Sequence, residues 1–170
     1  MKEPAPYAKG TKVDVEKSRL DLEALLAKHG ARNRAVVHND EQALTSIIFE
    51  ISGRRYRLDV PTPNLESFRP PKVAAPISQG WERWSASRRE QWIQQQYEQC
   101  CRERWRFLVL AMKAKLELVR IGLSTIEREF LADLLLPDGQ TASEALGQYM
   151  EKLLANGYSG PLALPAAPEQ

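Results

Sequence analysis

The sequence predicts an α+β fold: a small antiparallel β-sheet with one helix, a Pro-rich linker, then a long helix and two shorter helices forming a helical hairpin or bundle. Three observations support it. Residues 35–60 are rich in β-branched side chains separated by turn residues. Residues 61–80 hold five prolines, which exclude a helix or an interior strand. Residues 81–121 contain neither glycine nor proline, as expected for one long helix.

The first predicted unit, residues 1–60, is a strand, a helix and a three-stranded meander. Thr11–Val15 alternates polar and apolar side chains, as a short strand does. From Ser18 the leucines follow helical spacing, and Gly30 is a helix-stop signal. Ser52–Gly53 is a tight-turn signal between two strands. The strands of the meander are expected at residues 35–38, 43–51 and 54–60.

After a linker at residues 61–84, the second unit at residues 85–157 is predicted to be helical. Three capping boxes, each a Ser or Thr followed three residues later by Glu, predict where its helices begin. These helices are expected at Ser87–Ile121, from Ser124 to Leu136, and from Thr141 to Asn156. The apolar stripe Leu108–Val119 should contact the first unit. The Ala/Pro-rich tail at residues 158–170 is expected to be disordered.

The formal net charge of +2 hides a gradient along the chain. Residues 31–120 hold 16 basic and 10 acidic side chains, whereas residues 121–170 hold 2 basic and 7 acidic ones. All four tryptophans lie between positions 81 and 105, within the basic region. Arginine side chains match phosphate geometry, and aromatic rings stack on bases, so this mixture is typical of single-strand nucleic-acid binding.

The sequence therefore predicts a nucleic-acid-binding surface without catalytic residues. Phosphate contacts are assigned to arginines of the third strand and of the start of the long helix, and base stacking to the tryptophans before that helix. The predicted residues are Arg54, Arg55, Arg57, Trp81, Trp84, Arg88 and Arg89. Two alternatives stay open. In the first, Arg54, Arg55 and Arg57 are solvated charges that guard strand edges beside the hairpin turn. In the second, the basic stretch pairs with the acidic helices after Gly122, in the same chain or in a neighbouring subunit.

Several enzyme classes are disfavoured by missing residue patterns. Cys100 and Cys101 are adjacent, and with only His29 and His38 besides them a zinc site is not expected. No phosphate-binding loop, dinucleotide fingerprint or nucleophile elbow occurs. We therefore expect no cofactor, no metal and no enzymatic activity. The one enzymatic alternative is a metal-dependent nuclease that uses carboxylates of the Glu127–Asp133 helix.

The long helix also predicts a homodimer. Its apolar residues step by three or four positions, and the two C-terminal helices reach the end near Trp92 less easily. The rest of the stripe, around Ile93, Tyr97 and Cys100, is then predicted to pair with the same helix of a second subunit. In the intrachain alternative, the Pro-rich segment covers this end with its apolar side chains, which are Phe68, Val73 and Ile77.

Two parts of the chain resemble a family of small proteins encoded by tailed bacteriophages, prophages and related mobile elements. The first is YAKGTKVDVEKS at residues 7–18. The second is WRFLVLAMKAKLE at 105–117, continuing through TIEREFL at 125–131 to LPDGQT at 136–141. The resemblance carries over no functional residues. It implies a phage protein that acts in the bacterial cytoplasm, on DNA or on a host system.

The sequence thus favours a non-enzymatic accessory protein of a phage or mobile element that binds nucleic acid. The alternative is a protein–protein interaction module, either self-assembling or a phage protein that inhibits a host or defence protein. No apolar run reaches the roughly 18 residues that a membrane span needs, and the first residues lack the apolar core of a secretory signal. A cytoplasmic location in the bacterial host, with no membrane association, is therefore expected.

Overall fold

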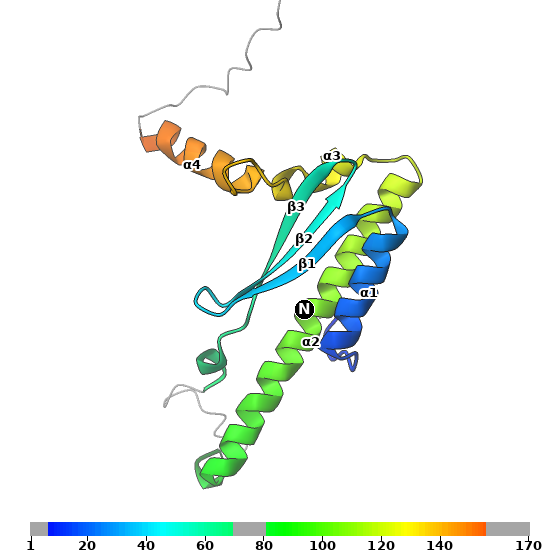
Figure 1. The fold of residues 1–170 in the computed structure, drawn as a ribbon. Helices are drawn as coiled ribbons and strands as arrows, with labels where there is room; N and C mark the ends of the chain where they lie inside the picture. The colour runs from blue at the N-terminus through cyan, green and yellow to red at the C-terminus, as the bar shows by residue number, and fades with distance from the viewer. Residues whose placement is uncertain (1–6, 70–80, 156–170) are drawn as a thin grey trace, which may run out of the picture.

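The computed structural model describes residues 7–69 and 81–155 of the chain. One helix is followed by three strands, a long helix and shorter helices, so the α+β class is confirmed (Figure 1). The predicted tail and the helix end at Asn156 lie outside the described residues. The elements are α1 (Val15–Lys28), β1 (Arg32–Asn39), β2 (Leu44–Ile51), β3 (Arg54–Pro61), α2 (Ala86–Arg120), α3 (Ile126–Phe130) and α4 (Ala142–Ala155), with short 3-10 helices η1 (Leu65–Phe68), η3 (Trp81–Arg83) and η4 (Leu131–Asp133).

The three strands form an antiparallel meander in the order β1-β2-β3, as predicted. Ser52 and Gly53 join β2 to β3, and both have positive φ angles, 54° and 74°. This is the backbone of a two-residue hairpin turn that matches the twist of the strands. Every second residue of β2 is buried, from Thr45 to Ile51. One face of the sheet therefore packs against the helices.

The predicted first strand, Thr11–Val15, does not form. Residues 11–14 have no regular secondary structure, and α1 begins at Val15. A strand needs a ladder partner for its backbone, and here side chains of α2 supply hydrogen bonds instead. Gln99 donates to the Thr11 carbonyl at 3.1 Å, and Glu103 accepts from the Gly10 N–H at 2.7 Å. The N-terminal stretch is thus tied to α2 rather than to the sheet.

Helix α2 extends for 35 residues, close to the predicted range, but its cap differs. The Ser85 hydroxyl, not that of Ser87, accepts from the Arg88 N–H. The stripe Leu108–Val119 meets the first unit, as predicted: Met112 is 1% exposed and Leu116 is 0% exposed, in one core with side chains of α1 and the sheet. The two predicted units therefore share a single core.

The C-terminal helices differ from the expected bundle. The helix predicted from Ser124 to Leu136 is short, because Leu134 instead forms an antiparallel bridge with Tyr56 of β3. Helix α4 packs on η4 rather than along α2 and extends away from the body of the molecule (Figure 1). Its predicted capping box is confirmed: Thr141 and Glu144 each bond the other's backbone N–H through their side chains.

Candidate nucleic-acid interface

Three tryptophans meet where α2 begins. Trp81 lies in η3, Trp84 just before the helix, and Trp92 nearly two turns into it. The Trp81 ring centroid lies 5.4 Å from that of Trp84 and 5.3 Å from that of Trp92, within the range of favourable aromatic pairs. All three side chains are partly exposed. These contacts hold the chain before the helix against the first turns of the helix itself.

Arginines lie on the same tryptophans. The Arg88 guanidinium is 4.4 Å from the ring centroid of Trp84, and that of Arg89 is 5.9 Å from Trp81. Arg89 also donates from Nε to the Trp81 carbonyl at 3.1 Å. Arg83 is exposed beside them. We call these six residues the Trp–Arg cluster: Trp81, Arg83, Trp84, Arg88, Arg89 and Trp92.

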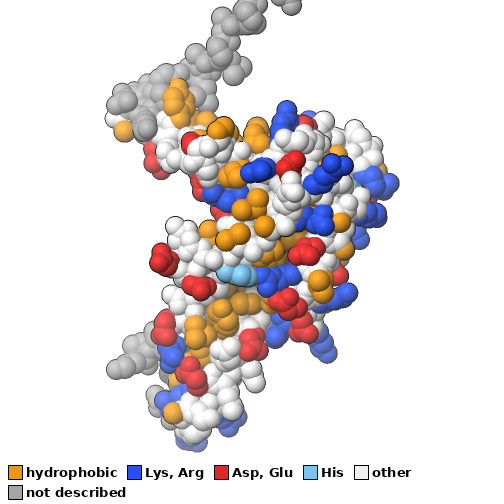
Figure 2. Space-filling model, viewed as in Figure 1, with side chains coloured by type: hydrophobic (Ala, Val, Ile, Leu, Met, Phe, Trp, Pro, Cys, Tyr) orange, Lys and Arg blue, Asp and Glu red, His pale blue; other side chains and the backbone are white. Residues whose placement is uncertain are grey.

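Two arginines of the Trp–Arg cluster, Arg83 and Arg88, have no acidic partner among the described side chains. The first turn of α2 carries no Asp or Glu. Glu90 binds Arg69 at 3.2 Å. Among the described side chains, no carboxylate lies within ion-pair distance of Arg83 or Arg88. Figure 2 shows Lys and Arg side chains at the tip of the molecule that the start of α2 forms. Arg83 and Arg88 therefore carry positive charge that no described carboxylate pairs with.

The predicted arginines of β3 lie elsewhere and are occupied. Arg54 binds Glu127 of α3 at 2.5 Å, and Arg57 binds Asp59 at 3.0 Å and Glu144 of α4 at 2.5 Å. Arg57 also donates to the Gly139 carbonyl at 2.9 Å. Figure 1 places the start of β3 near α3, at the opposite end of the molecule from the start of α2. The structure therefore does not bring the two predicted groups of arginines together on one surface.

The alternative pairing with the acidic helices holds for Arg54 and Arg57, within the same chain. The pKa of Glu127 is lowered, first by a hydrogen bond from its own backbone N–H and then by the nearby Arg54. The pKa of Glu144 is lowered, first by the Thr141 backbone N–H, with a contribution from Arg57. Both carboxylates are thus ionised at neutral pH. Arg55 is looser, 3.9 Å from Glu50, with its side chain 69% exposed.

The predicted dimer residues have intrachain contacts. Ile93 is 2% exposed within the single chain, and the Phe68 ring meets Tyr97 edge-on at 6.3 Å. Cys100 is partly buried. The intrachain alternative is therefore confirmed for Phe68, whereas Val73 and Ile77 lie outside the described residues. A dimer through this stripe stays a prediction.

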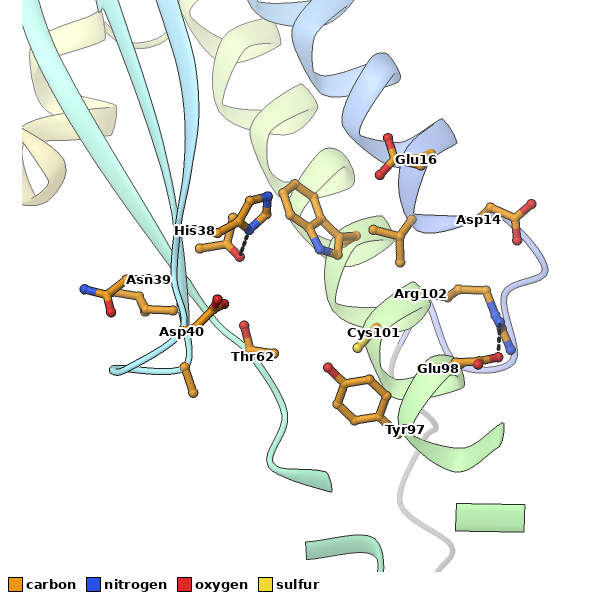
Figure 3. Close-up of a pocket in the computed structure, with 15 residues that line it drawn as sticks. Asp14, Glu16, His38, Asn39, Asp40, Thr62, Tyr97, Glu98, Cys101 and Arg102 are labelled. Carbon is orange, nitrogen blue, oxygen red and sulfur yellow. Dashed lines mark hydrogen bonds and ion pairs between the residues drawn. The ribbon is translucent and has the colours of Figure 1, made fainter. Parts of the chain in front are cut away.

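A cleft of about 630 Å³ lies between the start of α1, the β1–β2 turn and α2. Figure 3 shows Tyr97 and Cys101 on one wall and His38 and Asp40 on the other. Burial raises the pKa of Tyr97 and of the Cys101 thiol above their usual values. The thiol is therefore protonated at neutral pH, which disfavours it as a nucleophile. Among the described residues, no three His, Cys, Asp or Glu side chains converge as metal ligands.

Sequence reasoning missed Trp92 and the cleft. Trp92 could have been found, because it follows Arg88 by four positions and Arg89 by three, on the same helix face. The cleft had no such signal, because its walls come from three elements distant in sequence. The carboxylates of the nuclease alternative do not converge either: Glu127 binds Arg54, and Asp133 lies 3.8 Å from Lys115.

Comparisons of the chain with protein-family models, curated proteins and solved structures find no match. Within residues 7–69 and 81–155, none of the helices is both long enough and apolar enough to cross a bilayer.

Proposed function

We propose that this chain is a non-enzymatic nucleic-acid-binding accessory protein of a phage or mobile element, acting in the cytoplasm of its bacterial host. Its contact surface is the Trp–Arg cluster at the start of α2, without the arginines of β3. The observation that carries the proposal is the contrast in partners. Arg54 and Arg57 are held by carboxylates, whereas Arg88 lies on an indole ring.

An arginine stacked on tryptophan is well placed to bind phosphate. Stacking uses the flat face of the guanidinium and leaves its in-plane N–H groups free to donate. The Trp84 ring fixes the Arg88 side chain, so less rotamer entropy is lost when a phosphate binds. Because Arg88 covers one face of Trp84, a base would stack on another part of this partly exposed group of rings, formed with Trp81 and Trp92. The site therefore combines charge with stacking, as single-strand binding requires.

The test is fluorescence anisotropy with a labelled oligonucleotide of about 16 nucleotides, single-stranded or duplex. We expect the single strand to bind more tightly. Trp84→Ala should weaken binding about five- to hundredfold if a base stacks there. Arg88→Ala should lower the slope of log affinity against log salt by about 0.7 on single strands.

Arg55→Ala is the matched control, because it removes an exposed arginine at the other end of the molecule. It should leave affinity within about twofold and the salt slope nearly unchanged. Absence of binding to both forms at micromolar protein and low salt would contradict the proposal. Equal losses for Arg55→Ala and Arg88→Ala would show nonspecific attraction to positive charge instead.

A second candidate function is a protein–protein interaction module, acting on a host or phage protein or self-assembling as a homodimer. The observation favouring it is the number of large apolar side chains left exposed, with Phe107 at 56%, Leu123 at 72% and Leu131 at 60%. Exposed apolar side chains mark a binding site where they form a contiguous patch. Light scattering at micromolar concentration distinguishes a homodimer from a single chain that binds another protein. A mass near 19 kDa, that of one chain, rules out the homodimer.

A further inference from the structure

A mostly apolar groove of about 530 Å³ lies beside the outer edge of β3. Its floor is formed by α2, one wall by the end of β3, and the other wall by the turn at residues 7–10. Phe107 of α2 stands in it with its side chain 56% exposed. The lining residues are Ala8, Lys9, Asp59, Val60, Pro61, Glu103, Arg104, Phe107, Leu108 and Ala111.

The strand wall of the groove is an edge that already accepts another segment of chain. Sheet order places β3 at an edge, and Leu134 bridges to Tyr56 near the beginning of this strand. Leu135 donates its N–H to the Arg55 carbonyl at 2.9 Å. The main chain of Arg55 therefore points away from β2. Because alternate residues of a strand share this direction, the main-chain groups of Asp59 point the same way, towards the groove.

The charges around the groove indicate what it would accept. Glu103 accepts from the Gly10 N–H, and Arg104 donates to the Pro61 carbonyl at 2.5 Å. The Asp59 carboxylate is held by Ser46 and Arg57. Within the described part of the chain, Lys9 has no carboxylate at ion-pair distance. Among the described side chains, Arg104 likewise has no carboxylate at ion-pair distance, and Glu103 has no cation at that distance. Two unpaired cations against one unpaired carboxylate leave the rim with a net positive charge, which complements an acidic group.

We propose that this groove binds an extended apolar peptide segment of a partner protein, which adds as a strand to the outer edge of β3 and places a carboxylate near Lys9. Backbone hydrogen bonds to β3 would give affinity, and alternate side chains would enter the apolar floor beside Phe107. The part of the edge from Arg57 to Val60 accommodates about four extended residues, at roughly 3.3 Å each. Pro61 is not part of it, because it has no N–H and its carbonyl accepts from Arg104. This proposal is independent of the nucleic-acid proposal, because the Trp–Arg cluster takes no part in it.

The test selects displayed random octapeptides against the full chain and measures the enriched peptides by fluorescence polarisation. We expect alternating apolar residues together with Asp or Glu. Phe107→Ser should weaken binding about tenfold or more, as for a central apolar anchor. Lys9→Glu should weaken the acidic peptides several-fold. Because Phe107 is largely exposed, Phe107→Ser should fold, and circular dichroism checks this.

Two matched pairs isolate the strand edge and the groove. Asp59→Pro and Asp59→Ala lose the same side-chain contacts, but only the proline variant also loses the outward backbone N–H. Asp59→Pro should therefore bind the peptides several-fold more weakly than Asp59→Ala does. Leu20→Ser, 62% exposed on α1, should leave binding unchanged. A selection yielding no peptide whose binding depends on Phe107 would overturn the proposal. A doubled mass that returns to one chain in Phe107→Ser would also overturn it, because a second copy would then fill the groove.

Discussion

The two halves of α2 have the same apolar spacing but different surroundings. From Trp105 to Val119 the helix lies against α1 and the sheet, and its stripe is part of the main core. From Ala86 to Gln99 it extends beyond the sheet (Figure 1), and among the described residues of this half Ile93 is the one buried side chain. The anchored half of α2 therefore carries the core, and the projecting half presents tryptophan and arginine at the surface.

The largest expected effect is a loss of stability in the anchored half. Leu116→Ala empties a fully buried site in the main core and should lower the free energy of unfolding by about 2–5 kcal/mol. Ile93→Ala also removes a buried side chain, but one outside that core. Its loss should be smaller, because local opening relieves it. Urea unfolding followed by circular dichroism measures both, and equal losses would contradict the division of α2 into two halves.

The next effect concerns the attachment of α4 to the sheet. Arg57→Ala removes bonds to Asp59, Glu144 and the Gly139 carbonyl from a side chain only 20% exposed. We expect a loss of about 1–2 kcal/mol and faster amide exchange at the start of α4, with the projecting half of α2 unaffected. Arg55→Ala is the control and should change stability by less than about 0.5 kcal/mol. Faster exchange throughout the sheet would show that Arg57 supports the core instead.

Much of the fold was predictable because its signals are local. The meander follows from β-branched segments and the Ser52–Gly53 turn, and α2 follows from the absence of breakers. What failed depends on distant partners. Thr11–Val15 alternates like a strand but has no ladder partner, and the helix predicted to Leu136 ends early because Leu134 pairs with Tyr56 instead. Local pattern cannot specify a bond across many residues.

The candidate site likewise has a part that was predictable from the sequence and a part that was not. The clustering of Trp81, Trp84, Arg88 and Arg89 was predictable, because these residues are close in sequence. The ion pairs of Arg54 and Arg57 required the fold, since Glu127 and Glu144 lie more than seventy positions away. Charge segregation along the chain indicated such pairing only as an alternative. The groove beside β3 had no sequence signal at all.

A smaller effect tests how the projecting half begins. Ser85→Ala removes the hydroxyl that accepts from the Arg88 N–H, which should destabilise the first turn by about 1 kcal/mol. Ser87→Ala is the matched control, because it removes the same hydroxyl two residues later in the chain, and it should destabilise the first turn much less. Amide exchange at Arg88 and Arg89 reports on this turn directly. A larger effect for Ser87→Ala would restore the cap predicted from the sequence.

The smallest effect is a pH dependence confined to the C-terminal attachments. The pKa of Glu144 is lowered in the folded chain, mainly by the Thr141 backbone N–H. A lowered folded pKa means that the stabilisation is fully present above the unfolded value, about 4.3, and is lost as pH falls through the folded value. Asp133 has the opposite sign: burial raises its pKa, so protonation at low pH relieves a penalty. We therefore expect amide exchange at the start of α4 to accelerate as the pH falls below the unfolded pKa of Glu, about 4.3, beyond the intrinsic pH dependence of exchange. Glu144→Gln should flatten this dependence by removing the titrating group, whereas Glu151→Gln, an exposed residue further along α4, should preserve it. An unchanged dependence in Glu144→Gln would assign the acid sensitivity to another group.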